Sequence, residues 1–141
     1  MALVVWCLLP EHKTPITTLP CADIVSGCGN QNIQIHFDQI PQAMQPFRLQ
    51  IDTANALRVK QVHASFTMQG MDMGLNRYRL LSQVNGATQT NGVWIANITL
   101  PVCTQGQSDW RMTVELQTTT TTEQYQLAFA NRPATRHSNK P

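Results

Sequence analysis

Three methionines, Met68, Met71 and Met73, lie close together in this sequence and are its side chains best suited to a specific chemistry. Thioether sulfur is a soft ligand that suits Cu(I), and it needs no deprotonation before it binds. Met71 and Met73 are two positions apart between two glycines, a spacing that points two side chains the same way. We therefore expect them to bind one Cu(I), with Met68, His63 or a reduced cysteine completing the ligand set.

The same methionines also fit a purely structural interpretation. Methionine is unbranched and fills irregular gaps in a hydrophobic core, so the three side chains are equally typical of packing at the end of a β-sheet protein. His63 and His36 fall on the polar faces of their predicted strands, where a histidine is usually solvated. Both interpretations of the methionines therefore stay open at this point.

Enzymatic and nucleic-acid-binding functions are not expected for this chain. No Gly-x-Ser-x-Gly or similar nucleophile setting accompanies the histidines. The formal charge of +2 over 141 residues comes from Arg132, Arg136 and Lys140, without which seven basic and eight acidic side chains remain in residues 1–131. No basic stripe with interleaved aromatic residues exists to engage a phosphate backbone.

The four cysteines and the apolar amino terminus indicate an exported protein. Their spacing does not match the paired patterns of zinc or thioredoxin-like sites, so disulfides are expected, which require an oxidising compartment. We expect Cys103 to pair with Cys21 or Cys28, which would tie the amino-terminal stretch to the rest of the chain. Residues 1–10 are apolar and uncharged, and they resemble the end of a signal or membrane-anchor segment. The expected location is the periplasm, free or membrane-anchored.

Alternation of apolar and polar residues predicts the elements that must position the methionines. Seven short strands are expected, at 33–38, 47–51, 57–68, 75–84, 92–100, 110–116 and 125–129. With turn signals between them and no helical period, they predict a seven-stranded antiparallel immunoglobulin-like β-sandwich, with a closed barrel as the alternative. The expected core consists of Phe37, Leu49, Phe66, Trp94, Trp110, Val114 and Leu127.

Four regions follow from this pattern. Residues 1–10 are the signal or anchor remnant, 11–30 an irregular cysteine-containing lead, 31–131 the β-sandwich domain, and 132–141 a loose basic tail. At 141 residues the chain is long enough for one domain with its own core.

Several short motifs together resemble a known group of proteins. They are Met71-Asp72-Met73-Gly74-x-Asn76-Arg77, then Leu100-Pro101-Val102-Cys103 and Asp109-Trp110, preceded by Cys21 and Cys28. The pattern resembles small exported bacterial β-sandwich proteins that share M-x-M-G-x-N-R, L-P-x-C and a downstream Trp. More loosely, the methionine turn is similar to that of FixH-like and YtkA-like periplasmic domains, and the sandwich to CopC-like copper proteins.

The resemblance implies a periplasmic or membrane-tethered module for copper handling or respiratory-oxidase assembly. Its expected partners are a membrane protein complex or a copper-accepting protein. The amino-terminal histidine ligand of CopC-like proteins is absent here, which leaves Cu(I) bound through sulfur. A metal-free interaction domain of a membrane-associated complex is the second function that the sequence allows.

Overall fold

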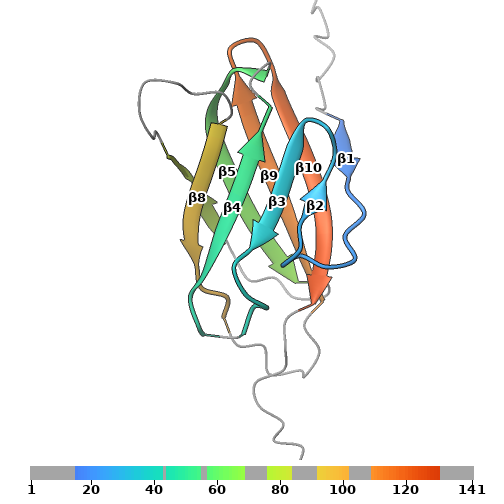
Figure 1. Cartoon of the computed structure of the whole chain (residues 1–141), viewed down its shortest axis with the longest axis vertical. Helices are drawn as coiled ribbons and strands as arrows, with labels where there is room; N and C mark the ends of the chain where they lie inside the picture. The colour runs from blue at the N-terminus through green and yellow to red at the C-terminus, as the bar shows by residue number, and fades with distance from the viewer. Residues whose placement is uncertain are drawn as a thin grey trace, which may run out of the picture.

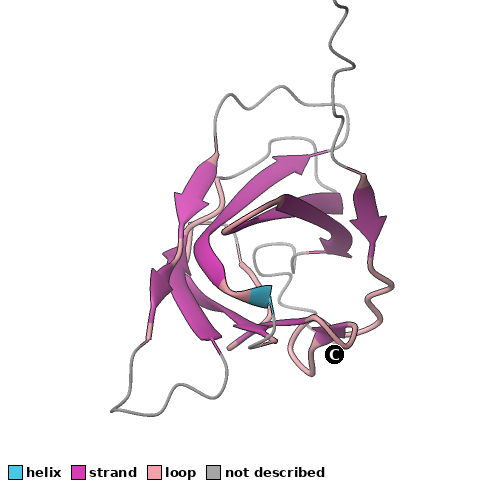
Figure 2. Ribbon diagram, turned by 90° about the horizontal axis from the view of Figure 1, so that it is seen from above, coloured by secondary structure: helices cyan, strands magenta, loops and turns pink. Residues whose placement is uncertain are grey.

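The chain folds into two β-sheets with almost no helix, as seen in a computed structural model. The structure describes residues 15–42, 44–54, 57–68, 76–83, 92–101 and 109–130. Ten strands form two five-stranded sheets (Figure 1), and seen from above the strands surround a common interior (Figure 2). Among these residues, no helix is long and apolar enough to cross a membrane.

Sheet A carries the strand that leads into the methionine-rich stretch. Its strand order is β1-β10-β9-β5-β6, antiparallel throughout except for β1, which runs parallel to β10. The bounds of its strands are Ile16–Thr18 for β1, Val59–Met68 for β5, Arg77–Arg79 for β6, Asp109–Thr118 for β9 and Thr122–Ala130 for β10.

Sheet B lies against sheet A and is antiparallel throughout, in the order β2-β3-β4-β8-β7. The bounds of its strands are Cys28–Gly29 for β2, Ile33–Phe37 for β3, Phe47–Thr53 for β4, Leu81–Ser82 for β7 and Gly92–Ile98 for β8. No hydrogen-bonded pairing joins the two sheets among the described strands, so the arrangement is a two-layered sandwich rather than a closed barrel.

The core forms where the alternating apolar residues of both sheets meet. In β9, for example, Trp110, Met112, Val114 and Leu116 are buried, and the residues between them face outward. All seven residues expected in the core are buried, which confirms the predicted alternation. Even Trp94, the most accessible of them at 8% exposed, points its indole N–H at the hydroxyl of the buried Thr53.

The strand count differs from the seven predicted. The predicted strand 75–84 divides at Leu80 into β6 of sheet A and β7 of sheet B, so the chain changes sheets at this residue. Leu80 is buried, and its side chain enters the core at the crossover. The short strands β1 and β2 lie within the lead, and both pair through backbone groups that residue type does not specify.

The disulfide also differs from the expectation. Cys21 and Cys28 are bonded to each other with Cα atoms 5.2 Å apart, so pairing of Cys103 with either of them is wrong. The cause is a local turn: the Asp23 carboxylate accepts a hydrogen bond from the Val25 N–H at 3.0 Å, and Gly27 takes a φ of 113°. Closing a loop of this length costs less chain entropy than reaching a distant cysteine. Cys103 lies outside the described residues.

Candidate metal site

The predicted ligands His63 and Met68 are both on β5, but they face opposite ways. His63 lies on the outer face of sheet A, and Met68 is the last residue of β5 and faces the core. Five residues of extended strand separate their Cα atoms by roughly 16 Å. Because a metal ion lies within about 2.5 Å of each ligand atom, His63 and Met68 do not share one ion.

Met68 packs as part of the core at the end of the sandwich. It is 5% exposed and lies directly opposite Trp110 of β9. The indole N–H of Trp110 is buried and has no hydrogen-bond partner in this structure. A thioether makes favourable contacts with an aromatic ring, so the Met68–Trp110 pair is stable as ordinary core packing. The same pair places one thioether sulfur at the end of the sandwich.

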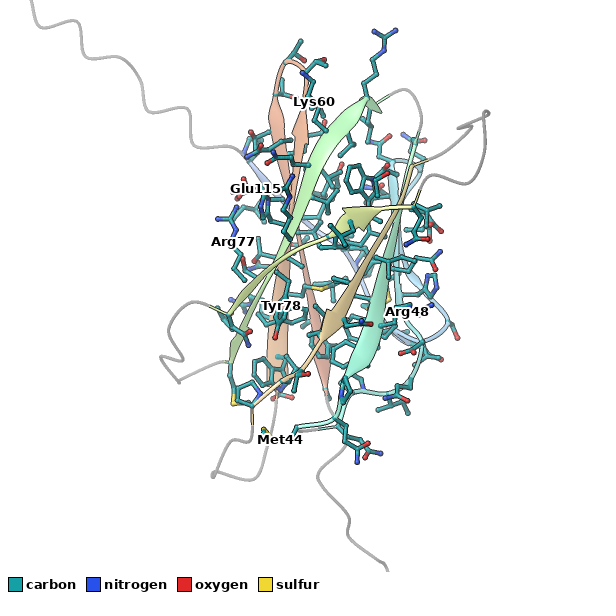
Figure 3. The ribbon with its side chains drawn as sticks, turned by 90° about the vertical axis from the view of Figure 1, so that its left-hand side faces the viewer. Met44, Arg48, Lys60, Arg77, Tyr78 and Glu115 are labelled. Atoms are coloured by element: carbon teal, nitrogen blue, oxygen red, sulfur yellow. A yellow bond between two sulfur atoms is a disulfide. The ribbon has the colours of Figure 1, made fainter. Side chains whose placement is uncertain are left out.

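His63 sits in a group of charged side chains on the outer face of sheet A. Arg79 of β6 and Glu115 of β9 lie directly opposite it on either side. Arg77 reaches across, with Nη2 3.7 Å from Glu115 Oε1 (Figure 3). His63 Nδ1 is buried and has no hydrogen-bond partner among the described residues. Burial and the Arg77 charge lower the pKa of His63, Glu115 acts against them, and Arg79 adds to the lowering.

This environment favours a neutral histidine held in the sheet surface rather than a ligand of the methionine site. A neutral imidazole is the form that binds a metal, but the two arginines beside it repel a cation. His36 is half-buried on the outer face of sheet B, opposite Gln50.

Met71 and Met73 lie outside the described residues, as does Asp72. What the structure does give is the position of the two strands that flank them. β5 ends at Met68, β6 begins at Arg77, and the two strands pair as an antiparallel hairpin. The Phe66 N–H donates to the Asn76 carbonyl at 2.9 Å, so the backbone pairing of the hairpin continues to Asn76, the first described residue after the methionine segment.

Met44 is a thioether that the sequence analysis did not consider. It lies in the connection between β3 and β4, its side chain is 62% exposed, and its φ is 64°. The Met44 N–H donates to the Leu100 carbonyl at 2.8 Å, which holds this conformation. A non-glycine residue in the left-handed region is uncommon and often marks a functional position. In the sequence, Met44 is marked only by its place between two prolines, Pro41 and Pro46.

Met68 ends β5 and Met44 lies in the connection between β3 and β4, and the end of β5 and this connection are both at the lower end of the sandwich in Figure 1. A chain of aromatic rings connects the elements there: the ring of Phe37 lies 4.6 Å from that of Phe47 and 5.0 Å from that of Phe129, and Phe129 lies 6.1 Å from Phe66. Met44 precedes Phe47 by three residues, and Met68 follows Phe66 by two. Figure 3 shows Met44 at this end.

At this end of the sandwich, the described residues include thioether ligands, which suit a soft metal ion, and no cluster of the ligands that hard metal ions use. No three His, Cys, Asp or Glu side chains come together in the part of the chain that the structure describes. Zinc, calcium and magnesium bind through such groups. Thioethers are ligands for Cu(I), and Met44 and Met68 carry them at this end.

Comparison with known proteins adds no family: no family model and no curated protein matches this chain.

Proposed function

We propose that this chain is a periplasmic copper-binding or chaperone-like module that holds one Cu(I) through thioethers at the lower end of the sandwich. Met71 and Met73 are the principal ligands, as their spacing suggests. The observation that carries the proposal is the presence of Met68 and Met44 at this same end. Because two thioethers leave Cu(I) under-coordinated, one of these two side chains completes the ligand set.

The order of the strands supports an immunoglobulin-like fold for this module. Strands β3, β4, β8 and β7 take the positions of strands A, B, E and D, and β10, β9, β5 and β6 take those of G, F, C and C′. In such a sandwich, the hairpin between β5 and β6 presents its connection at one end of the molecule, where loops carry function.

The Cys21–Cys28 disulfide supports the periplasmic location. Structural disulfides persist in oxidising compartments and are rare in the cytosol. A copper module there would exchange its ion with a copper-accepting protein or a membrane protein complex, in line with a role in respiratory-oxidase assembly.

A metal-free interaction domain of a membrane-associated complex is the second candidate. The burial of Met68 favours it, because a 5% exposed methionine opposite Trp110 is what ordinary core packing produces. Under this alternative, the methionine segment contacts a partner protein directly and no ion is held.

Titration with Cu(I) under reducing conditions, in competition with a moderate-affinity chelator, separates the two functions. The parent protein is expected to take up one Cu(I), and the Met71→Leu, Met73→Leu double variant none. The variant keeps side-chain volume and hydrophobicity, so its fold should lose less than about 1.5 kcal/mol. Met112→Leu is the matched control, because Met112 is fully buried in the middle of β9.

The outcome that contradicts the proposal is equally defined. A parent that takes no Cu(I) from the chelator, or a double variant that binds as tightly as the parent, leaves the methionines as packing or contact residues. Uptake that is lost in Met112→Leu would place the ion elsewhere in the core.

A further inference from the structure

A groove of about 550 Å³ opens at the lower end of the sandwich, between the lead and the ends of β9 and β10. None of its lining residues belongs to the β5–β6 hairpin. Its lining consists of Cys21, Ala22, Asp23, Ile24, Ile40, Asp109, Ala128, Phe129 and Ala130. Figure 1 shows the lead crossing β10 near the lower end of that strand.

The lead, which forms one wall of the groove, is held in place by hydrogen bonds to both sheets. The Leu19 N–H donates to the Gln126 carbonyl of β10 at 2.8 Å, and the Phe37 N–H of β3 donates to the Ile24 carbonyl at 3.0 Å. The Cys21–Cys28 disulfide closes the loop that contains Ile24. The lead is therefore fixed to both sheets, and the groove has two fixed sides.

Each side of the groove carries a carboxylate. Asp23 belongs to the lead, and its side chain is oriented by hydrogen bonds from Ser26 Oγ at 2.7 Å and from the Val25 N–H. These bonds lower the pKa of Asp23, so it is ionised at neutral pH. Asp109 begins β9 and is exposed. Among the described residues, neither carboxylate forms an ion pair.

The rest of the groove is apolar. Ile24 and Phe129 are buried beneath it, and small alanine side chains flank Phe129. Ile40 is 42% exposed and borders the same groove. Exposed apolar surface next to unpaired carboxylates suits a ligand that is aliphatic and cationic at once.

We propose that this groove binds a segment of a partner protein that carries aliphatic side chains close to arginine or lysine. The aliphatic side chains contact Ile40, Ile24 and Phe129, and the cationic groups pair with Asp23 and Asp109. The argument rests on shape and charge complementarity and is independent of copper binding. It gives the module a contact surface at the same end as its proposed metal site.

The test uses a synthetic peptide, acetyl-Leu-Arg-Leu-Arg-Leu-amide, and measures its Kd for the full chain by fluorescence anisotropy. Asp23→Asn with Asp109→Asn should weaken binding at least tenfold, because asparagine keeps the turn that Asp23 orients but removes both charges. The matched control is Asp52→Asn with Glu115→Gln, which removes two negative charges at positions that do not line the groove. That control should bind within about twofold of the parent at equal ionic strength.

The apolar half of the proposal has its own measurements. Ile40→Ser should weaken binding severalfold, and a peptide with citrulline in place of arginine should bind as poorly as the parent peptide binds the double aspartate variant. In an NMR titration, amide shifts should concentrate at Ile24, Ile40, Ala128 and Ala130.

Three results would overturn the proposal. They are equal binding by the two double variants, equal binding of the citrulline peptide, and amide shifts that concentrate away from the groove. A further variant replaces Arg132, Arg136 and Lys140 by glutamine. If the peptide binds only to this variant, the groove is occupied by the basic tail of the chain itself, and a partner segment is excluded.

Discussion

The hydroxyl of Tyr78 donates a hydrogen bond to the backbone carbonyl of Thr99 at 2.9 Å, which connects an edge strand of sheet A to the chain leaving β8 of sheet B. The Tyr78 ring also packs edge-on against Phe66, with centroids 5.8 Å apart. One side chain thus links the two sheets at the edge where the chain crosses between them at Leu80.

Removing this hydroxyl should cost a modest amount of stability. Tyr78→Phe keeps the ring contact with Phe66 and loses only the bond to Thr99, so the free energy of unfolding should fall by about 0.5 to 1 kcal/mol. Urea denaturation measures it, and an unchanged m-value would show that the sheets still unfold together. An unfolding free energy equal to that of the parent would mean that water replaces the bond without cost.

A charge in the core should be far more costly than the same charge one residue away. Val114 is fully buried, and Thr113 precedes it on the outer face of sheet A between Ser65 and Gln126. Val114→Asp should lose several kcal/mol or fail to fold, because it buries an unpaired carboxylate. Thr113→Asp should stay within about 0.5 kcal/mol of the parent. Similar losses in the two variants would refute the register of β9.

The disulfide should contribute measurably despite its short loop. A sequence separation of seven between Cys21 and Cys28 predicts a loss of roughly 2.5 kcal/mol on reduction in the chain-entropy model. Urea denaturation with and without reductant gives the difference, and Cys21→Ala with Cys28→Ala should remove it. In oxidised protein, mass spectrometry after thiol labelling should find these two cysteines unlabelled. Labelling at either one would contradict the pairing.

His63 should make the fold less stable as the pH falls. Burial and the nearby arginines hold its pKa below 6.5, so the unfolded chain binds a proton at a higher pH than the folded chain does. Its contribution is therefore complete above pH 6.5 and declines as the pH falls from there toward the lowered pKa. Denaturation midpoints for the parent and His63→Gln across this range should diverge accordingly.

The pKa itself is open to NMR titration of the His63 ring. Arg79→Gln should raise it by removing a nearby positive charge, and Glu115→Gln should lower it further by removing a negative one. Arg48→Gln, on β4 of the other sheet, should leave it unchanged. An unchanged pKa in both of the first two variants would mean that burial alone sets it.

The sequence determined the sheet class and the identity of the core, because a strand has a strict period of two. Alternation placed Phe37, Leu49 and Val114 inside and His63 outside without reference to any partner strand. Local patterns of this kind need no knowledge of distant contacts. The position of Met68 at the end of a strand followed from the same alternation.

Only the tertiary structure decided what depends on contacts between distant segments. The crossing at Leu80, the pairing of β1 with β10 and the cysteine partner are set by backbone hydrogen bonds and chain closure, which carry no signature in residue type. The candidate site divides between the two: strand alternation by itself directs His63 and Met68 to opposite faces, although they are near in number. Met44 is distant in number, and the fold brings it to the Met68 end of the sandwich.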